Sequence, residues 1–322
     1  MKNNNKKIPI AISGCLLGQN VRFNGGHKKN RYISDTLGGY FEWVTFCPEV
    51  AIGLGIPRNP IRLEKENGVV RLFDSITNET HTESMKMYGR KILEELTANP
   101  VYGYILKSKS PSCGIHNVNI QISKEGKINK NGMGIYTSVL KESLPNLPME
   151  EEGRLSDAGI RENWIARVFA YYDFKSTVYP SPTIGKLVEF HSSAKFTVLS
   201  HCEKTYRILG RLVANADQKS ALEVAAEYEN LFMLALSKKT APKKNLNVML
   251  HLFGFFKNKL DSKSRSNLLE TIEDYSKGTY PLVVPITLIH HYAKILDIKY
   301  LMNQSYLQPY PKTLSLRNNL VS

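Results

Sequence analysis

The chain of 322 residues contains only four cysteines, and they stand far apart in the sequence. So few cysteines exclude a disulfide-stapled fold, and a reducing cytosol would leave them as free thiols that can bind metal. The apolar runs are also short, far below the ~20 residues that a membrane-spanning helix needs. No internal repeat of fixed period is evident. With 42% hydrophobic and 22% charged residues, the composition is that of an ordinary globular protein.

The amino-terminal segment carries one pattern typical of a targeting signal. Lysines up to Lys7 precede apolar residues 8–12, and Ile-Ser-Gly-Cys at 12–15 is similar to the cleavage site of a bacterial lipoprotein. A real signal of this kind has an apolar core of about 7–15 residues. Because the stretch here is shorter, we expect a cytoplasmic protein that has no membrane anchor. No protein partner is evident.

The chain is strongly basic, with a formal net charge of +14. Residues 1–185 contain 24 Lys and Arg against 18 Asp and Glu, and residues 186–322 contain 19 against 11. A broad positive field attracts polyphosphate partners and makes their binding depend on salt. A basic composition that serves only solubility is the alternative. The size of the excess, and its higher density in the second half, favour a nucleic-acid partner.

Strand-like and helix-like segments alternate over residues 8–173. The patterns predict strands at 8–13, 42–46, 60–64, 69–73 and 102–107, and helices at 82–97, 134–143 and 156–173. Asn67-Gly68 between two of these strands is typical of a hairpin turn. Ser156-Asp157 ahead of an apolar helical period is typical of a helix start. The alternation predicts a layered, Rossmann-like α/β domain, which we assign to residues 1–175.

A segment rich in Pro, Ser and Gly at 174–185 predicts a domain boundary. Beyond it strand signals largely vanish. Helical periodicity runs through 186–214, 217–238, 245–260, 265–277 and 284–296. The second half is therefore predicted to be an all-helical bundle domain, residues 186–322.

Three of the four cysteines, Cys15, Cys47 and Cys113, each follow a predicted strand. If the sheet is parallel, the carboxyl ends of its strands share one edge, and ligands bind in the crevice there. Three distant thiolates could then meet and hold a soft-metal site with one open position, such as an iron–sulfur cluster used for chemistry. A buried structural thiol is the alternative for Cys15 alone. Cys202 lies in the helical half, and we interpret it as an ordinary helix residue.

A carboxylate, Glu49, stands two residues after Cys47, with Pro48 between them. A carboxylate beside a soft ligand can serve as base for a water near the metal. The alternative is a negative charge that favours a helix N-terminus. Around Cys113, residues 107–114 supply hydroxyls that can donate to cluster sulfurs and lysines that could hold phosphate or substrate.

In the helical half, three segments interleave aromatic with basic residues: 190–196, 204–207 and 251–259. Aromatic and basic faces can stack bases and grip phosphates. The more common arrangement puts such aromatics in the core of a bundle and the bases on its solvated face. Both interpretations stay open for each segment.

These motifs resemble the TudS family of thiouracil desulfurases. The matching segments, in family order, are 13–18, 22–26, 46–50, 55–58, 60–63, 106–114 and 132–134. The second half is similar to the YbgA-type domain, from Phe190-His191 to residues 308–311. It departs from that pattern at Cys202-Glu203, where Ser-Pro is usual after the histidine. The pairing of the two is similar to the RudS fusion proteins, which remove sulfur from 4-thiouridine in tRNA.

The resemblance implies a [4Fe-4S] cluster held by Cys15, Cys47 and Cys113, whose unique iron takes the sulfur of a thiolated pyrimidine. It implies that Glu49 activates the attacking water. A serine of the 110–112 loop, taken as Ser110, would help with proton transfer or orientation. Sulfur is replaced by oxygen without redox change, so the cluster acts as Lewis acid and sulfur acceptor. The implied substrate is 4-thiouridine in tRNA, and tRNA is the implied partner.

Two other functions stay open. One is an enzyme that acts on free thiobases such as 2-thiouracil, in which the helical domain serves another end. The other is an iron–sulfur protein that binds nucleic acid or senses a signal without turnover. Glu49 beside Cys47 argues against the second, since a sensor needs no base.

Overall fold

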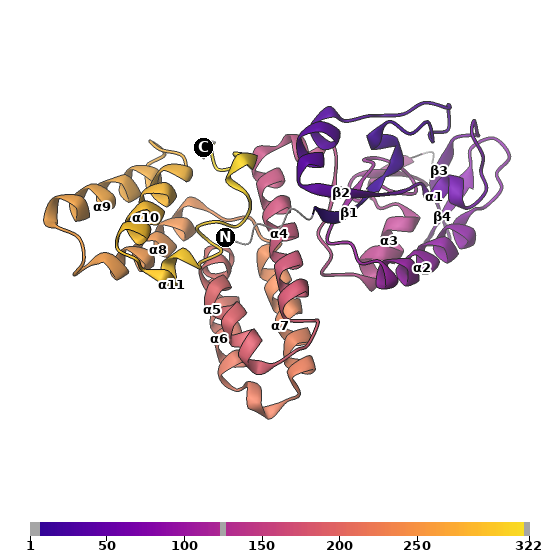
Figure 1. Ribbon diagram of the computed structural model, residues 1–322. Helices are drawn as coiled ribbons and strands as arrows, with labels where there is room; N and C mark the ends of the chain where they lie inside the picture. The colour runs from indigo at the N-terminus through magenta and orange to yellow at the C-terminus, as the bar shows by residue number, and fades with distance from the viewer. Residues whose placement is uncertain (1–6, 123–126, 319–322) are drawn as a thin grey trace. The chain divides into compact units, whose positions relative to one another are not determined.

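The computed structural model describes residues 7–122 and 127–318. Its internal contacts divide the chain into two compact units, of which the first ends at Ser156 and the second begins at Asp157. The first unit has mixed strands and helices, and the second is helical (Figure 1). The predicted class, a layered α/β half followed by an all-helical half, is confirmed. Within the described residues, no helix has the length and apolar character that crossing a membrane requires.

The first unit contains a four-stranded sheet in which every pairing is parallel. Its strands, in spatial order, are β2 (Phe41–Phe46), β1 (Ile8–Ser13), β5 (Tyr104–Leu106) and β8 (Met149–Glu151). In the register of β1 with β2, Ser13 lies level with Phe46. The chain therefore leaves both strands at the same edge of the sheet, and Cys15 and Cys47 follow within two residues.

A second sheet joins two hairpins through a parallel pair. Its strands, in spatial order, are β4 (Val69–Asp74), β3 (Ile61–Glu66), β6 (Val118–Ile122) and β7 (Lys127–Gly132). The predicted turn between β3 and β4 is confirmed, and it uses positive φ at Asn67 (48°) and Gly68 (84°). The sequence patterns missed β6, β7 and β8. The last two are short or polar, and β7 is mostly exposed, so neither shows the apolar alternation of a half-buried strand.

Two long helices accompany the sheets of the first unit, α2 (Thr82–Ala98) and α3 (Ile135–Ser143), close to the predicted bounds. They lie side by side (Figure 1). Gly89 of α2 faces Val139 of α3 so closely that a methyl group on the glycine would come 3.1 Å from the valine side chain. A buried hydrogen bond of 3.2 Å between the hydroxyls of Tyr104 and Tyr136 links β5 to α3. A single-turn helix, α1 (Pro48–Ala51), follows β2 directly.

The second unit consists of helices. They are α4 (Ala158–Thr177), α5 (Ile184–His201), α6 (Glu203–Ala214), α7 (Ala221–Leu236), α8 (Pro242–Phe253), α9 (Ser262–Ser276), α10 (Val283–Ile295) and the short α11 (Lys299–Met302). Asp157 caps α4 by accepting a hydrogen bond of 2.7 Å from the amide of Ile160, at the predicted start. Stacked aromatic rings fill one part of the core, with Phe174 5.6 Å from Tyr228 between ring centroids.

Two features of the helical half differ from the sequence-based expectation. The segment predicted as one helix over 186–214 is broken at Cys202, whose extended backbone (φ −155°, ψ 104°) begins α6. The interpretation of Cys202 as an ordinary helix residue is therefore wrong. In addition, α4 belongs to the helical unit, so the units divide between 156 and 157 rather than in the Pro-rich segment. The buried side chains of α4, Trp164 and Val168 among them, explain why it packs there.

Buried His201 predicts that the helical unit loses stability in acid. Its Nδ1 lies 2.5 Å from the carbonyl oxygen of Lys238, and burial lowers the pKa of His201 to about 4, aided by the charge of Lys244. In the unfolded chain His201 takes up a proton near its ordinary pKa of 6.5, whereas in the folded chain it stays neutral to a lower pH. The stabilisation is thus complete above the unfolded pKa and is lost as the pH falls toward the folded one, by at most about 3 kcal/mol.

We therefore expect the urea midpoint of the helical signal, followed by circular dichroism, to fall as the pH is lowered through this range. His201→Asn can donate a similar hydrogen bond but does not titrate, so its midpoint should depend less on pH. An identical pH dependence in the two proteins would contradict this role of His201.

Candidate functional site

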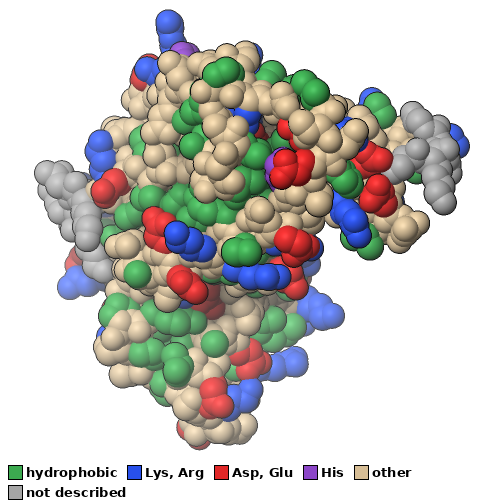
Figure 2. Space-filling model, turned by 90° about the vertical axis from the view of Figure 1, so that its right-hand side faces the viewer, with side chains coloured by type: hydrophobic (Ala, Val, Ile, Leu, Met, Phe, Trp, Pro, Cys, Tyr) green, Lys and Arg blue, Asp and Glu red, His purple; other side chains and the backbone are tan. Residues whose placement is uncertain are grey.

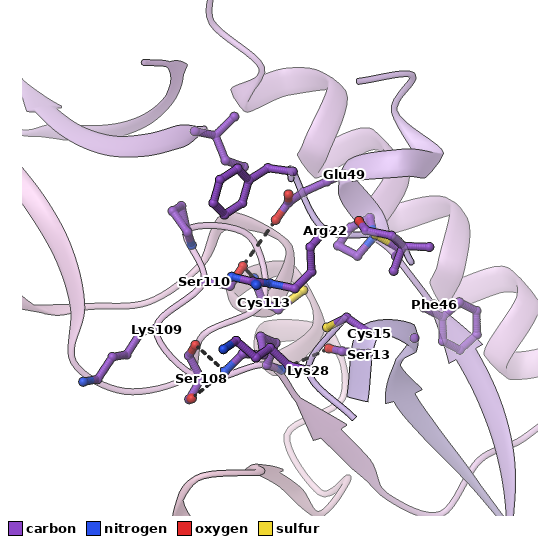
Figure 3. Close-up of a pocket in the computed structure, with 18 of the residues that line it drawn as sticks. Ser13, Cys15, Arg22, Lys28, Phe46, Glu49, Ser108, Lys109, Ser110 and Cys113 are labelled. Atoms are coloured by element: carbon purple, nitrogen blue, oxygen red, sulfur yellow. Dashed lines mark hydrogen bonds between the residues drawn. The ribbon is translucent and has the colours of Figure 1, made fainter. Parts of the chain in front are cut away.

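The three post-strand thiols line one cavity. Cys15 lies in a 3-10 turn after β1, Cys47 begins α1 after β2, and Cys113 lies in the loop between β5 and β6. Together they border a cavity of about 390 Å³ in the first unit. The sulfurs of Cys15 and Cys113 point toward the same space (Figure 3). The parallel sheet thus brings together residues that are up to about a hundred positions apart, as its topology requires.

Burial shapes the acidity of these thiols. It raises the pKa of Cys15 to about 11, with a further contribution from the neighbouring Cys47 thiol. Burial also raises the pKa of Cys47 and the pKa of Cys113, and the negative charge of Glu49 raises both further. The Cys47 thiol raises the pKa of Cys15, and both of these thiols raise the pKa of Cys113, as expected where thiolates would repel one another. A metal group that binds here must displace their protons and supply the missing positive charge.

The donor set of the cavity is that of a soft-metal group. Across residues 7–122 and 127–318, no three His, Cys, Asp or Glu side chains lie close enough to ligate one metal ion. The three thiols nevertheless share one cavity. Thiolates select iron–sulfur clusters and other soft metals, and a cluster is larger than an ion, so its ligands stand further apart. The residues present therefore suit an iron–sulfur group with three thiolate ligands.

Glu49 is held at the cavity wall by hydrogen bonds to both carboxylate oxygens. Its Oε2 accepts bonds from Nη2 and Nε of Arg58 at 2.6 and 3.0 Å. Its Oε1 accepts bonds from the hydroxyls of Ser112 at 2.5 Å and Ser110 at 3.4 Å. The side chain of Arg58 is only 4% exposed and that of Glu49 16%. The carboxylate is thus fixed in orientation, with its dashed bond to Ser110 visible in Figure 3.

Arg58 is a site residue to which the sequence analysis assigned no role. Its Nη2 donates to the carbonyl of Val21 and its Nη1 to that of Gly55, both at 2.9 Å. The guanidinium therefore joins the segment that follows β1 to the one that follows α1. Its membership of the matching segment 55–58 was the one signal that could have pointed to it.

The serines of the Cys113 loop divide their contacts. Ser110 lines the cavity, and its Oγ accepts bonds from the amides of Ser112 at 3.3 Å and Cys113 at 3.1 Å. Ser112 is fully buried behind it. Its hydroxyl lies within hydrogen-bond reach of Glu49 and 3.5 Å from the sulfur of Cys113. Ser110, like Ser108, lines the cavity and can reach a ligand there, while Ser112 connects Glu49 with the thiol of Cys113.

Two carboxylates at the carboxyl end of β8, the strand beside β5, hold the thiol loop in place. Glu152 accepts bonds from the amide of Ser108 at 2.6 Å and its hydroxyl at 2.8 Å, and it pairs with Lys107. Glu151 accepts bonds from the amides of Ile115 at 2.7 Å and His116 at 3.0 Å. Sequence reasoning missed both. The run of three glutamates at 150–152 after a short apolar stretch was the available signal.

Position 134 is a glycine because the backbone there passes close to the loop that carries Cys113. Its amide donates to the carbonyl of Gly114 at 2.8 Å. A Cβ at this position would come 2.2 Å from the carbonyl oxygen of Ser112. Only glycine lets the start of α3 approach the loop that carries Cys113.

The cavity wall is rich in positive charge. Five basic residues line it, Arg22, Lys28, Arg58, Lys107 and Lys109, with Glu49 as the only lining carboxylate. Arg58 and Lys107 pair with Glu49 and Glu152. Among the residues that the structure describes, no ion pair involves the other three. A surplus of unpaired cations favours an anionic group at the mouth of the cavity, although Lys109 itself extends away from the thiols (Figure 3).

Cys202 lies outside this cavity, in the helical unit. Its sulfur accepts a hydrogen bond of 3.3 Å from the hydroxyl of Thr205, which lowers its pKa. The surroundings of Cys202 therefore lower its pKa, whereas the surroundings of the three cavity thiols raise theirs.

Known families match both halves of the chain. The family described as 2-thiouracil desulfurase matches residues 10–152, which include the whole cavity wall. A family described as a protein of unknown function, DUF1722, matches residues 195–311.

Individual relatives match about half of the chain each. YbgA of Escherichia coli K12, an uncharacterized protein, is 30% identical over 159 residues, which are 49% of this chain and 94% of YbgA. YbbK of Bacillus subtilis 168, also uncharacterized, is 29% identical over 152 residues, 44% of this chain and 96% of YbbK. A solved structure of the [4Fe-4S]-dependent thiouracil desulfidase TudS shares 30% identity, covering 47% of this chain and 94% of that one, with a TM-score of 0.39.

Proposed function

Because the chain belongs to the family of YbgA, with a TudS-type domain joined to its YbgA-like domain, we propose that it is a [4Fe-4S]-dependent desulfidase. Its proposed substrate is 4-thiouridine in tRNA, which it converts to uridine with release of sulfide. The observation that carries the proposal is the single cavity that three thiols and Glu49 share within the matched residues 10–152. A tRNA substrate places the protein in the cytoplasm.

The proposed ligands of the cluster are Cys15, Cys47 and Cys113. When bound, such a cluster supplies a Lewis-acidic iron that can accept the sulfur of a thiocarbonyl. The reaction consumes one water: its oxygen becomes the carbonyl oxygen of uridine, its two protons are released, and the sulfur leaves as sulfide. No electrons are gained or lost in this exchange.

The chain's own groups supply the proton transfers. Glu49 is the proposed base through its Oε1, which accepts bonds from the hydroxyls of Ser112 and of Ser110, and Ser110 lines the cavity; Oε2 is held by two donors of Arg58. It would take a proton from the attacking water. The hydroxyl of Ser110 faces the cavity and can orient that water or the base. Arg58 and Ser112 act as positioning residues, since both touch Glu49.

Two charge features favour tRNA over a free base. The cations Arg22, Lys28 and Lys109 border the cavity, where a nucleotide phosphate would be attracted. The helical unit, residues 157–322, contains 22 Lys and Arg against 14 Asp and Glu. On the face drawn in Figure 2, basic and acidic side chains are interspersed. We propose that the helical unit makes the contacts to RNA, because its Lys and Arg outnumber its Asp and Glu.

A desulfidase of free thiobases is the second candidate. A cavity of about 390 Å³ admits a pyrimidine without any attached RNA. Comparing turnover of 2-thiouracil with turnover of 4-thiouridine in tRNA decides between the two. A protein that binds a cluster but converts neither substrate would point to the non-catalytic alternative.

The cluster assignment predicts the behaviour of single cysteine variants. Alanine at position 15, 47 or 113 removes one thiolate ligand, so each variant should lose the cluster. Cys202→Ala should keep it, because Cys202 does not line the cavity. Iron, sulfide and visible absorbance after anaerobic reconstitution measure the outcome. Full retention in one of the three cavity variants, or loss in Cys202→Ala, would show that the assignment is incorrect.

The role of Glu49 predicts a catalytic loss without loss of the cluster. Glu49→Gln removes the base but keeps an oxygen that can accept from Arg58, so turnover should fall about 10²–10⁴-fold. Glu42→Gln on β2 is the matched control, since Glu42 is exposed and lies outside the cavity. Initial rates are compared at equal cluster content. Near-normal turnover of Glu49→Gln would remove this residue from the mechanism.

The unit boundary predicts how the chain can be shortened. A protein that ends at Ser156 should keep its cluster and any activity on small thiobases, yet lose activity on tRNA. One that ends at Thr183 retains α4 without its packing partners and exposes Trp164 and Val168, so it should aggregate. If the protein that ends at Ser156 desulfurates tRNA as well as the full chain does, the helical unit is not needed for the reaction.

A further inference from the structure

Phe23 is an exposed aromatic ring in the wall of the thiol cavity. It lines the cavity with 39% of its area exposed. Among the described residues that line this cavity, the other aromatic one is Phe46, which is only 7% exposed. The ring of Phe46 packs against Tyr104 with centroids 6.1 Å apart, and it points away from the thiols (Figure 3). Phe23 is therefore the ring that a ligand in the cavity can cover.

The loop that carries Phe23 is fixed by backbone hydrogen bonds. The amide of Gly25 donates to the carbonyl of Arg22 at 2.9 Å, and Gly25 has a positive φ of 71°, which glycine adopts without strain. The carbonyl of Phe23 accepts a bond of 2.8 Å from the amide of Arg58. The side chain of Arg58 in turn holds Glu49. The loop of the exposed ring and the proposed base are thus anchored to the same residue.

The polar side chains of the lining leave little to pair with the edge of a base. None of the described lining residues is Asn or Gln, whose amides both donate and accept. The serine hydroxyls of the lining already contact protein groups, namely the amide of Lys107 for Ser13, Glu152 for Ser108 and Glu49 for Ser110. The guanidinium of Arg22 lies over the ring of Phe23, 5.3 Å from its centroid, and so covers one face of it. The lining therefore favours contact with the face of a flat ring.

We propose that Phe23 is a specificity-determining residue that selects planar pyrimidine rings, by stacking on them with the face that Arg22 leaves open. The pyrimidine rests on the proposed function, and the stacking rests on the exposed, anchored ring. Stacking tolerates different bases because every base has a π face. Phe23 therefore selects for an aromatic ring and not for one pattern of hydrogen-bonding groups. A saturated ring with the same groups is rejected.

The test measures binding of two sulfur-free nucleosides to the full-length chain with its reconstituted cluster. Uridine and dihydrouridine carry the same hydrogen-bonding groups, but saturation makes the second ring puckered and removes its π face. Neither has a thiocarbonyl for the cluster, so affinity reports the contacts of the ring and sugar. Isothermal titration calorimetry should show uridine bound about tenfold more tightly than dihydrouridine, which corresponds to one stacked base.

Variants of Phe23 separate the ring from the bulk of the side chain. Phe23→Leu keeps an apolar group, so its affinity for dihydrouridine should stay within about twofold while that for uridine falls about tenfold. Phe23→Tyr keeps the ring and should keep the preference. With 2-thiouracil as substrate, Phe23→Leu should raise KM about tenfold and change kcat by less than about threefold, because the ring contacts substrate and transition state alike.

Phe255→Leu is the matched control. Phe255 is 40% exposed, close to the value of Phe23, and it lies in the helical unit outside the cavity. Its removal should leave both affinities and KM unchanged. The proposal is overturned if the unaltered protein binds the two nucleosides equally or binds neither. It is also overturned if Phe23→Leu keeps the preference for uridine, if Phe23→Tyr loses it, or if Phe255→Leu loses it to the same extent.

The outcome is separable from that of the proposed function. If the chain prefers uridine through Phe23 but removes sulfur from no thiolated substrate, the desulfidase proposal fails and the stacking role stands. If it removes sulfur and Phe23→Leu has the affinities and KM of the unaltered protein, the stacking role fails and the enzyme stands.

Discussion

The parallel pairing of β1 with β2 and β5 is the constraint on which the candidate site depends. Side chains alternate between the faces of a strand, so a register slip of one residue would turn every side chain to the opposite face. Such slips are costly here because β1 is almost wholly buried, as is usual for strands in a parallel sheet that is covered on both faces. With the register fixed, Ser13 and Phe46 end their strands level with each other. The positions of Cys15 and Cys47, which follow these two strands, are thereby fixed at one edge of the sheet.

Around these thiols the chain places buried polar groups that hold one another. A buried ion pair such as Glu49–Arg58 costs desolvation, and it is tolerated when its remaining donors and acceptors are satisfied. Arg58 meets this condition through two backbone carbonyls, and Glu49 meets it through two serine hydroxyls. The resulting network fixes the carboxylate in a single orientation. That rigidity is what a base aimed at one water requires.

The two units use different means to bring distant residues together. In the first, loops at a sheet edge carry the functional side chains, and glutamates at the carboxyl end of β8 bind the backbone of those loops. In the second, helices carry the side chains, and an apolar core sets which helical faces remain exposed. Phe196 belongs to that core, whereas Phe255 lies at its surface with 40% of its area exposed. The core interpretation is thus confirmed for Phe196, whereas a nucleic-acid contact stays a prediction for the exposed Phe255.

The sequence by itself determined the local elements and the positions of the candidate ligands. Apolar alternation and helical periodicity identified β1 to β5 and most helices, because those signals arise between residues close in the chain. The rule that parallel strands share a carboxyl edge then indicated that Cys15, Cys47 and Cys113 approach one another. Only the tertiary structure showed that Arg58 and Ser112 hold Glu49, that Glu152 holds the thiol loop, and that Cys202 breaks a helix. Glu49 and Ser112 are 63 positions apart and Ser108 and Glu152 are 44 apart. Hydrogen bonds between such residues leave no periodic trace in a sequence, because they depend on how whole elements pack rather than on the preference of any single segment.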